Sequence, residues 1–513
     1  MPEKIPAKVD YIKPLEDKPY RDVIIEKKSY REELRRKLAD VVGEANVNDD
    51  LETIEKYSKD VSLEPEGRPS FVVYPKNTGE VCTIVQLANE LLFPIVPVSS
   101  GTHNYGCAIP RMGGIVVDLS GWKKIFKIDY RNRSTRIEPG VNYNELQQAL
   151  EKEDLRALMP LLPRKDQSIL TAHLEAHPMM IPEFNYSEPL YTAEIVLPKG
   201  RILRTGSAAP APPETINTDM VSPWGPGFDW NRLYTRAQGT LGIVTWANIM
   251  AEPLPTKEKF YFTPFNDMDS VVTFTYRILR KWLGYECFAL NSVNLASILA
   301  DKMPDDYVQL KKKLPEYTHF FCIAGLKRFP EERIAYQEID FMETAQEIGV
   351  KPQLTIPEVP KASAFFAKHV RRCWDKDVYW KDAYKGASAD IFFLTTMDQT
   401  SKFITAMKEE ANALAYPAAD IGIYLQPIEN GRAAHLEFTI PYNPTDKEEC
   451  TLVKKLHASA SERMYTIGSL FTRAYGKWAD MVNGRNAIHY QTAKKIKDYL
   501  DPNNIMNPGK LGF

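Results

Sequence analysis

Residues 233–245 read LYTRAQGTLGIVT, and this stretch is the most informative one for the fold of the chain. Gly239 and Gly242 bracket a tight turn that leads directly into an apolar strand. Because glycine has no Cβ, the backbone at such a turn can approach a flat or anionic ligand closely. A plain turn into a strand is the alternative interpretation, and two other segments help to decide between them.

The first of these segments is residues 99–106, SSGTHNYG, which follow an expected strand at 94–98. Small residues let successive backbone N–H groups converge on an anion, and serine and threonine hydroxyls add donors, as a pyrophosphate requires. The run is not G-x-G-x-x-G, has no Walker A lysine, and does not lead into a helix. It therefore predicts a nest of N–H groups, with an ordinary polar turn as the alternative.

The second is the chain end, residues 500–512, LDPNNIMNPGKLG, which predicts a helix stop followed by an extended tail packed on the molecule. Hydrophobic periodicity around these segments predicts a crossover with parallel strands, formed by a strand at 70–74, a helix at 81–92 and the strand at 94–98. Further strands are expected at 115–119, 135–138, 191–197, 201–205 and 243–251, and helices at 31–42 and 143–152.

A change in texture follows Pro253-Leu254-Pro255, which marks a domain boundary. Longer helices are expected beyond it, at 268–283, 331–348 and 447–465. The 513 residues are enough for two or more units, and we expect a first domain over 1–255, a second over 256–480 and a return of residues 481–513 to the first.

Composition excludes several classes of protein. With 65 Lys plus Arg against 67 Asp plus Glu, the chain has no basic excess for nucleic acid or an anionic membrane. Its six cysteines form no C-x-x-C pair, and its eight histidines show no metal-ligand spacing, so neither a metal site nor a disulfide framework is expected. The N-terminus shows no export signal and no apolar run approaches 20 residues, so we expect a soluble cytoplasmic protein without a membrane span.

In order and spacing, the chain resembles the flavoprotein family of vanillyl-alcohol oxidase and the p-cresol methylhydroxylase flavin subunit. The segments that carry the resemblance are 68–69, 99–106, 138–141, 168–173, 239–245 and 501–510. The resemblance implies an α+β fold, in which two lobes of an FAD-binding domain hold the dinucleotide and an α/β cap domain covers the isoalloxazine ring. Residues 1–255 and 481–513 would then bind FAD, and 256–480 would form the cap and most of the substrate pocket.

The same resemblance implies the cofactor-binding residues, and it leaves the attachment of the flavin open. Some relatives carry a covalent flavin on a first-loop histidine, here His103, and others on a cap histidine, here His435. The alternatives are that His103 only hydrogen-bonds and that His435 is a packed strand residue beside Glu437. The residues implied to contact FAD are Ser99, Ser100, Gly101, Thr102, His103, Asn104, Ser168, Ile169, Ala172, Gly239, Gly242, Ile243 and Lys510.

For catalysis, the resemblance implies that a first-loop tyrosine, here Tyr105, polarises a substrate oxygen. It also implies that a carboxylate near the flavin, here Glu175, assists hydride removal, whereas a partly solvated helix carboxylate is the other interpretation. The family's late Tyr-Arg pair is replaced by Trp478-Ala479, unless the register slips to Tyr475 or Arg473, and this puts a para-phenol substrate in doubt. The second phosphate loop, RKDQSILTA at 164–172, also lacks the usual glycines.

These observations predict an FAD-dependent oxidoreductase that removes hydride from a benzylic or phenolic alcohol, an alkylphenol or a 2-hydroxy acid. Electrons would then pass to oxygen, a cytochrome or an iron-sulfur partner subunit, because this chain has no haem or cluster ligands of its own. We also expect a homo-oligomer. The rival hypothesis is a non-catalytic or electron-relay subunit of a larger redox complex, and it rests on the two departures from the family pattern.

Overall fold

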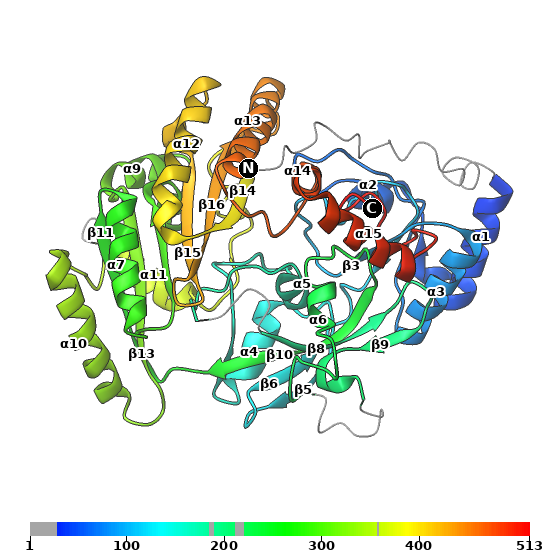
Figure 1. Ribbon diagram of the computed structural model, residues 1–513, viewed down its shortest axis with the longest axis horizontal. Helices are drawn as coiled ribbons and strands as arrows, with labels where there is room; N and C mark the ends of the chain where they lie inside the picture. Colours follow the sequence, from blue (N-terminus) through cyan, green and yellow to red (C-terminus); the bar gives the residue numbers. More distant parts are fainter. Residues whose placement is uncertain (1–27, 184–188, 211–219, 357–358) are drawn as a thin grey trace, which may run out of the picture.

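The computed structural model describes residues 28–183, 189–210, 220–356 and 359–513. Three β-sheets organise these residues, and helices pack against each of them (Figure 1). Two of the sheets come from the first half of the chain, and the third comes from residues 257–442. The mixed α+β fold agrees with the prediction from sequence.

The first sheet contains the predicted parallel crossover. Strands β2 (Phe71–Val73) and β3 (Ile95–Val98) are joined through helix α3 (Thr78–Leu91), and both run parallel to β4 (Ile115–Asp118), which lies between them. The carboxyl end of β3 therefore opens directly into the 99–106 loop. The fourth strand, β1 (Val47–Asn48), pairs antiparallel with β2 at the edge of the sheet. Beside the sheet lie η2 (Glu44–Asn46), α1 (Lys28–Val42) and α2 (Leu51–Ser58).

The second sheet is antiparallel, with the strand order β5-β6-β10-β8-β9 and β7 paired to β10. The hairpin predicted around residues 198–200 is confirmed, because β8 and β9 pair antiparallel. Its strands are β5 (Ile125–Asp129), β6 (Ser134–Ile137), β7 (Leu155–Ala157), β8 (Leu190–Val196), β9 (Ile202–Arg204) and β10 (Ile243–Pro253). The helices beside it are α4 (Tyr143–Glu151), α5 (Ile169–Leu174), η3 (Gly206–Ala208) and α6 (Asn231–Tyr234).

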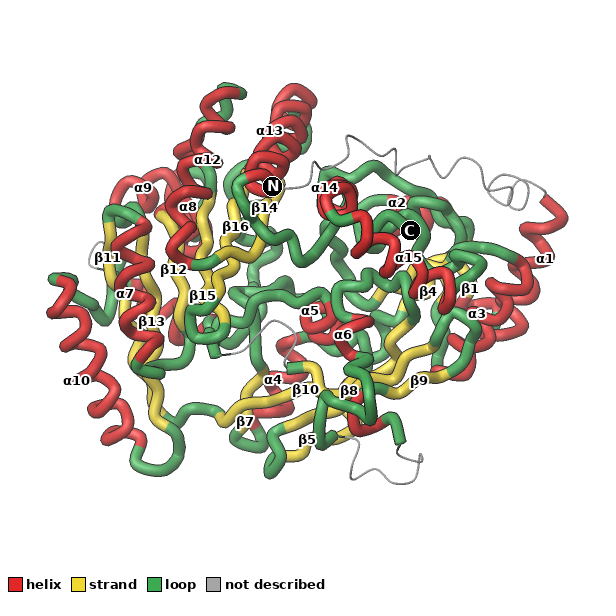
Figure 2. The backbone as a smooth tube through the Cα atoms, viewed as in Figure 1, coloured by secondary structure: helices red, strands yellow, loops and turns green. Residues whose placement is uncertain are grey.

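The third sheet is antiparallel, with the order β11-β13-β12-β15-β16-β14, and Figure 2 shows its helices gathered at one side of the molecule. Helix α7 (Met268–Arg280), which lies within the helix predicted at 268–283, packs against β11 and β13 of this sheet. The strands are β11 (Lys257–Phe265), β12 (Cys287–Asn291), β13 (Tyr317–Gly325), β14 (Ala387–Thr395), β15 (Gly422–Ile428) and β16 (Ala433–Tyr442). The helices are α7 (Met268–Arg280), α8 (Ser292–Leu299), α9 (Asp305–Lys313), α10 (Pro330–Ile348), α11 (Lys361–His369), η4 (Met397–Gln399), α12 (Thr400–Ala413), η5 (Ala418–Asp420) and α13 (Lys447–Thr466).

The end of the chain lies against the first sheet. Helices α14 (Lys477–Arg485) and α15 (Ala487–Leu500) precede a tail in which Met506 forms a parallel bridge with Ile95 of β3. The ammonium of Lys497 is buried, and it donates to Asp501 at 2.5 Å and to the carbonyl oxygens of Thr240 and Met506. The tail is therefore fastened to the first sheet and to the turn that precedes β10.

Within the described ranges, no helix is long and apolar enough to cross a bilayer. No cluster of histidine, cysteine or acidic side chains in these ranges could hold a metal ion, and the six cysteines are free thiols.

Candidate active site

Three segments that are far apart in sequence line one cavity of about 1140 Å³, a volume that includes the solvent at its mouth. They are the first loop, which follows β3 (residues 97–108), the second loop with α5 (167–177) and the turn before β10 (234–244). Asn507 of the tail also lines the cavity. We call this space the first cavity. Most of the residues implied to contact FAD line it: Ser99, Ser100, Thr102, His103, Asn104, Gly239, Gly242 and Ile243.

Side chains of the second loop hold the first loop in place. Ser168 caps helix α5, because its hydroxyl oxygen accepts a hydrogen bond from the N–H of Thr171. The backbone N–H of Ser168 donates to the hydroxyl oxygen of Ser100 at 3.0 Å. Thr102 donates to Asp166 at 2.6 Å. The altered second loop therefore supports the first loop through side-chain contacts. Of the other predicted contact residues, Ile169 and Ala172 are buried in α5 and do not line the cavity, and Gly101 packs against Asp166.

The turn before β10 requires glycine for geometric reasons. Gly239 has φ +70°, and a Cβ there would lie 2.6 Å from Cγ of Pro97 in the first loop. The equivalent Cβ at Gly242 would meet Cγ2 of Ile195 at 2.7 Å. Close contact between the first loop and this turn is thus possible only without side chains at these positions.

The C-terminal tail joins the first loop to the turn before β10. The amide of Asn507 donates to the carbonyl oxygens of Cys107 at 3.1 Å and Gln238 at 2.6 Å. The ammonium of Lys510 donates to the carbonyl oxygen of Gly106 at 2.5 Å, and burial lowers the pKa of Lys510 to about 8. Lys510 does not line the first cavity, so its contact with the loop supports the cavity wall.

A second cavity of about 1290 Å³, again including the solvent at its mouth, lies next to the first one. Its walls come from the third sheet and from the loops at 61–64, 160–167 and 473–478. Five residues line both cavities and so mark the junction between them: Asn104, Tyr105, Gln167, His177 and Tyr475.

Two tyrosines stack at this junction. The rings of Tyr105 and Tyr475 have centroids 5.0 Å apart and planes inclined by 11°. Tyr475 donates to Oε2 of Glu175 at 2.7 Å, and burial raises the pKa of that carboxyl group. Glu175 is therefore held by a hydrogen bond in the cavity wall, and it can take up or release a proton at a higher pH than an ordinary glutamate.

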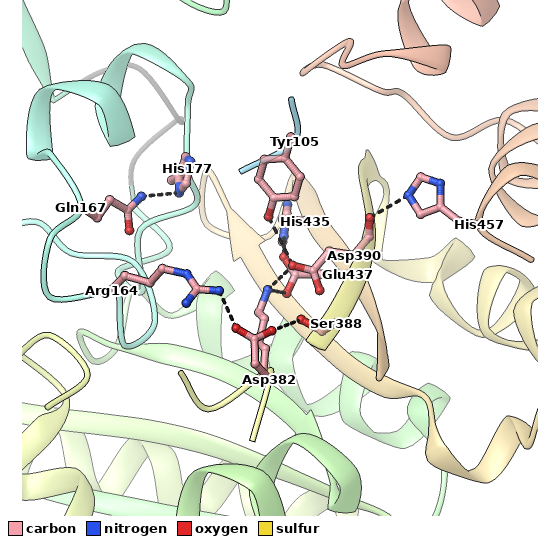
Figure 3. A network of polar contacts seen from close by, with 11 residues as sticks. Tyr105, Arg164, Gln167, His177, Asp382, Ser388, Asp390, His435, Glu437 and His457 are labelled. Atoms are coloured by element: carbon pink, nitrogen blue, oxygen red, sulfur yellow. Dashed lines mark hydrogen bonds and ion pairs between the residues drawn. The ribbon is translucent and has the colours of Figure 1, made fainter. Parts of the chain in front are cut away.

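Charged side chains line the second cavity, and Figure 3 shows the polar contacts among them. The ammonium of Lys381 lies 2.7 Å from Asp390 and 2.5 Å from Glu437. Tyr105 donates to Asp390 at 3.2 Å, and His435 lies 3.3 Å from Glu437 (Figure 3). His435 and Glu437 share one face of β16, as the strand alternation predicted.

The remaining predicted catalytic residues lie in or behind this wall. Trp478 lines the second cavity, but its indole N–H donates to Ser461 at 2.9 Å, so it contributes an aromatic wall. His435 is fully buried and does not line either cavity. Arg473 and Tyr475, the two residues of the alternative register, both line the second cavity together with Trp478.

Several residues of the site were not predicted. His177 lines both cavities, its Nδ1 lies 3.2 Å from the amide of Gln167, and burial with the nearby Arg473 charge holds its pKa well below the ordinary value. Lys381 and Asp390 were also missed. The sequence offers one signal for His177, its place two residues after Glu175, and no local signal for the other two residues.

Comparisons with known proteins agree with this geometry. The FAD binding domain family matches residues 69–206, and the C-terminal domain of FAD-linked oxidases matches residues 475–511. These two stretches contain the first loop, the second loop and the tail. The chain is an FAD-linked oxidoreductase.

Relatives of this oxidoreductase act on different substrates. The glycolate oxidase subunit GlcD of Bacillus subtilis is 23% identical over 490 residues, which are 93% of this chain and 96% of the relative. The mitochondrial D-lactate dehydrogenase [cytochrome] of Arabidopsis thaliana is 23% identical, over 86% of this chain and 73% of the relative.

The fold is shared with solved flavoproteins. A substrate-bound p-cresol methylhydroxylase superposes with a TM-score of 0.80 at 17% identity and covers 95% of this chain and 97% of its own. The 4-ethylphenol oxidase of Gulosibacter chungangensis gives a TM-score of 0.78 at 17% identity, over 94% and 97% of the two chains.

The first cavity fits FAD, the cofactor of this oxidoreductase. The backbone N–H groups of Ser100, Thr102, His103 and Asn104 make no hydrogen bond to any described residue, so they remain available to a pyrophosphate. The buried hydroxyl of Tyr234, in the cavity wall, likewise lacks a partner among the described residues. Buried polar groups without partners are costly, and a polar ligand in this cavity would satisfy them.

Proposed function

We propose that this oxidoreductase takes hydride from the benzylic carbon of a phenolic alcohol or alkylphenol. The observation that carries the proposal is the stacked pair Tyr105 and Tyr475, two residues that each line both cavities. Rings also form much of the second cavity's wall, and flat aromatic substrates pack well against them. These wall residues are Tyr379, Trp380, Tyr424 and Trp478.

The charges of the second cavity support a neutral or singly ionised aromatic substrate. Lys381 is neutralised by Asp390 and Glu437, and Arg164 pairs with Asp382 at 2.7 Å. Arg473 is buried, with its guanidinium 3.7 Å above the ring of Phe392. We infer that Arg473 stabilises the developing negative charge on a substrate oxygen, the role left vacant by Trp478-Ala479.

FAD, when bound, supplies the hydride acceptor. The protein groups bind and orient the substrate and manage protons. The Tyr475 hydroxyl donates to Glu175, so its oxygen keeps lone pairs for a substrate hydroxyl or a water molecule. His177, kept neutral by burial and positioned by Gln167, is a further hydrogen-bonding group at the same junction.

We further propose that residues 1–255 and 481–513 hold FAD and that residues 256–480 cover the site. The first loop, Ser168 with the second loop, and the turn from Gly239 to Ile243 would contact the dinucleotide. Electrons then leave to oxygen or to a separate carrier. The word cytochrome in the name of the Arabidopsis relative supports a haem protein as one such carrier.

A 2-hydroxy acid is the second candidate substrate, and it is favoured by the names of the relatives that act on glycolate and D-lactate. A small carboxylate would need an unshared cation in the second cavity. Lys381 is paired with Asp390 and Glu437, and Arg164 is paired with Asp382. A 2-hydroxy acid therefore fits this cavity less well than a phenol.

Anaerobic reduction of the purified yellow protein tests the proposed function. We expect 4-hydroxybenzyl alcohol to bleach the flavin absorbance at 450 nm within seconds, and D-lactate and glycolate at equal concentration to leave it unchanged. Bleaching by D-lactate alone would assign the 2-hydroxy acid class. A colourless preparation that does not take up FAD would favour the rival hypothesis of a non-catalytic subunit.

Covalent attachment of the flavin is a separate proposal. His103 lines the first cavity, and burial lowers its pKa, so its imidazole is neutral and nucleophilic at neutral pH. His435 does not reach the cavity, so we propose attachment through His103. After acid precipitation, the wild-type pellet should stay yellow and the His103→Ala pellet should turn white. A yellow variant pellet would overturn this assignment.

A further inference from the structure

We propose that Asp390 receives the proton of the substrate's phenolic hydroxyl group through Tyr105, so that the substrate is held as an oxyanion when hydride leaves it. The inference rests on the proposed function, because it requires a phenolic substrate. It gives a role to a carboxylate in strand β14, a strand whose sequence showed no sign of chemistry.

The geometry behind this proposal is a repeated arrangement. Each of the two stacked tyrosines donates its hydroxyl proton to a different carboxylate, Tyr105 to Asp390 at 3.2 Å and Tyr475 to Glu175 at 2.7 Å. A phenol that donates to a carboxylate keeps its oxygen lone pairs free to accept a second hydrogen bond. Both tyrosines can therefore accept a hydrogen bond from a bound substrate.

The two carboxylates lie in different cavities, and this separates their roles. Glu175 lines the first cavity but not the second, so its proton chemistry is on the side of the cofactor. Asp390 lines the second cavity but not the first, so it faces the end of the substrate that is remote from the cofactor. In a para-substituted phenol, the hydroxyl group is the end opposite the benzylic carbon. Asp390 is thus placed for the phenolic proton, and Glu175 for the reacting carbon.

The charge cluster, formed by Lys381, Asp390 and Glu437, can accept the phenolic proton. Burial and the negative charge of Glu437 raise the pKa of Asp390, while Lys381 acts in the opposite direction. Burial also acts to raise the pKa of Glu437, but Lys381 and His435 hold it well below the ordinary value, so Glu437 stays ionised. One lysine between two carboxylates leaves a net negative charge, and a proton on Asp390 neutralises it.

The groups that face Asp390 come from every neighbouring element. His457 of α13 donates from Nε2 to the Asp390 carbonyl oxygen at 3.1 Å, and this fixes the strand (Figure 3). Burial lowers the pKa of His457 to about 4, so it stays neutral above that pH. The charged or titratable groups that interact with Asp390 are Lys381, Glu437, Tyr105, Tyr379 and His457. His435 and Arg473 act on two of these groups, Glu437 and Tyr105.

The step balances without any other reactant. The substrate's phenolic O–H bond breaks and its proton bonds to the oxygen of Tyr105, while the hydroxyl proton of Tyr105 passes to Oδ2 of Asp390. Tyr105 ends neutral, Asp390 ends as a carboxylic acid, and the substrate ends as a phenolate. The total charge in the cavity is unchanged, so no ion has to enter a buried site.

Binding of 4-hydroxybenzaldehyde tests this step without turnover. The compound is the aldehyde expected from 4-hydroxybenzyl alcohol, and its phenolate and phenol forms have well-separated ultraviolet bands. Titrated into the FAD-loaded wild-type protein at a series of pH values, it should bind as the phenolate, with an apparent pKa at least one unit below that of the free compound. Because Asp390 must be ionised to accept the proton, the phenolate band should fade as the pH is lowered through the pKa of Asp390.

Two variants should lose this effect by removing different atoms. Asp390→Asn and Tyr105→Phe should each raise the apparent pKa of the bound phenol by at least one unit, which is a tenfold change in the proton equilibrium. In the double variant the apparent pKa of the bound phenol should rise no further than in the more affected single variant, because both substitutions interrupt the same proton pathway. Tyr105→Phe keeps the ring, so it remains informative if the loss of Asp390 impairs folding.

Matched controls separate this role from structural effects. Asp420→Asn removes a carboxylate of η5 that pairs with Lys311 outside both cavities, and it should leave the phenolate band unchanged. Glu175→Gln should also leave the band unchanged, although it slows hydride removal. An unchanged band in Asp390→Asn, or an equal loss in Glu175→Gln, would overturn the proposal.

The proposed function can fail separately from this inference. If 4-hydroxybenzyl alcohol does not bleach the wild-type flavin, the substrate class is wrong. If it bleaches the wild type, and the rate in Asp390→Asn follows the same pH profile as in the wild type, the substrate class stands and the role of Asp390 is wrong.

Discussion

Gly239→Ala is expected to yield a protein that contains at least tenfold less FAD than the wild type. The new Cβ would lie 2.6 Å from Cγ of Pro97, on a residue with φ +70°. A left-handed alanine costs about 1–2 kcal/mol, and a clash in a packed region costs about 1–3 kcal/mol more. Relief of the clash moves the turn away from the first loop, and the two sides of the cofactor cavity separate. The absorbance ratio of flavin to protein after gel filtration measures the effect.

Gly121→Ala is the matched control for this prediction. Gly121 is exposed, has no atom within 4 Å of a built Cβ, and does not lie in the left-handed region. Its alanine variant should keep the full FAD content and the wild-type midpoint of thermal unfolding. Equal FAD content in the two variants would show that the turn before β10 does not form a wall of the cofactor site.

Glu175→Gln is expected to slow anaerobic flavin reduction by about 10²–10⁴-fold, the range typical of a lost acid-base group. Glutamine keeps the size of the side chain but cannot take up a proton. Burial raises the pKa of Glu175, with Tyr475 and Arg473 acting in the opposite direction. If the ionised form is needed, the wild-type rate should rise with pH through this raised pKa, above the ordinary value of about 4.3 for glutamate. Stopped-flow absorbance at 450 nm gives the rates.

The variant's pH profile is as informative as its rate. In Glu175→Gln the acid limb of the profile should vanish, because the group that produces it is absent. Glu331→Gln, on helix α10 and paired with Lys257 outside both cavities, should keep both the rate and the limb. A Glu175→Gln protein with a wild-type limb would assign the limb to another group, with Asp390 as the first to examine.

Much of the fold was predictable because local pattern specifies it. Strand alternation and helical spacing predicted the crossover through α3, the hairpin of β8 and β9, and helices such as α10. The sequence could not show that β4 lies between β2 and β3, since strand order depends on long-range pairing. It also could not show which side chains of the second loop support the first loop, because Asp166 reaches Thr102 across 64 positions.

The cofactor cavity was predictable to a greater extent than the substrate cavity. Small residues at close backbone approaches leave a mark in the sequence, as at Gly239 and Gly242. Lys381 and Asp390 leave none: Lys381 comes from a loop, and Asp390 comes from a strand that pairs with the strand of Glu437 only in the folded sheet. Each has a sequence environment like that of a surface residue, and only the fold buries them together.

The most direct test of the whole account is a crystal structure of the protein with FAD and 4-hydroxybenzaldehyde. We expect the pyrophosphate on the N–H groups of Ser100 and residues 102–104, and the isoalloxazine ring at the junction marked by Tyr475 and His177. The ligand's hydroxyl group should point to Tyr105. An isoalloxazine ring outside this junction, or a ligand bound in a different cavity, would contradict the account.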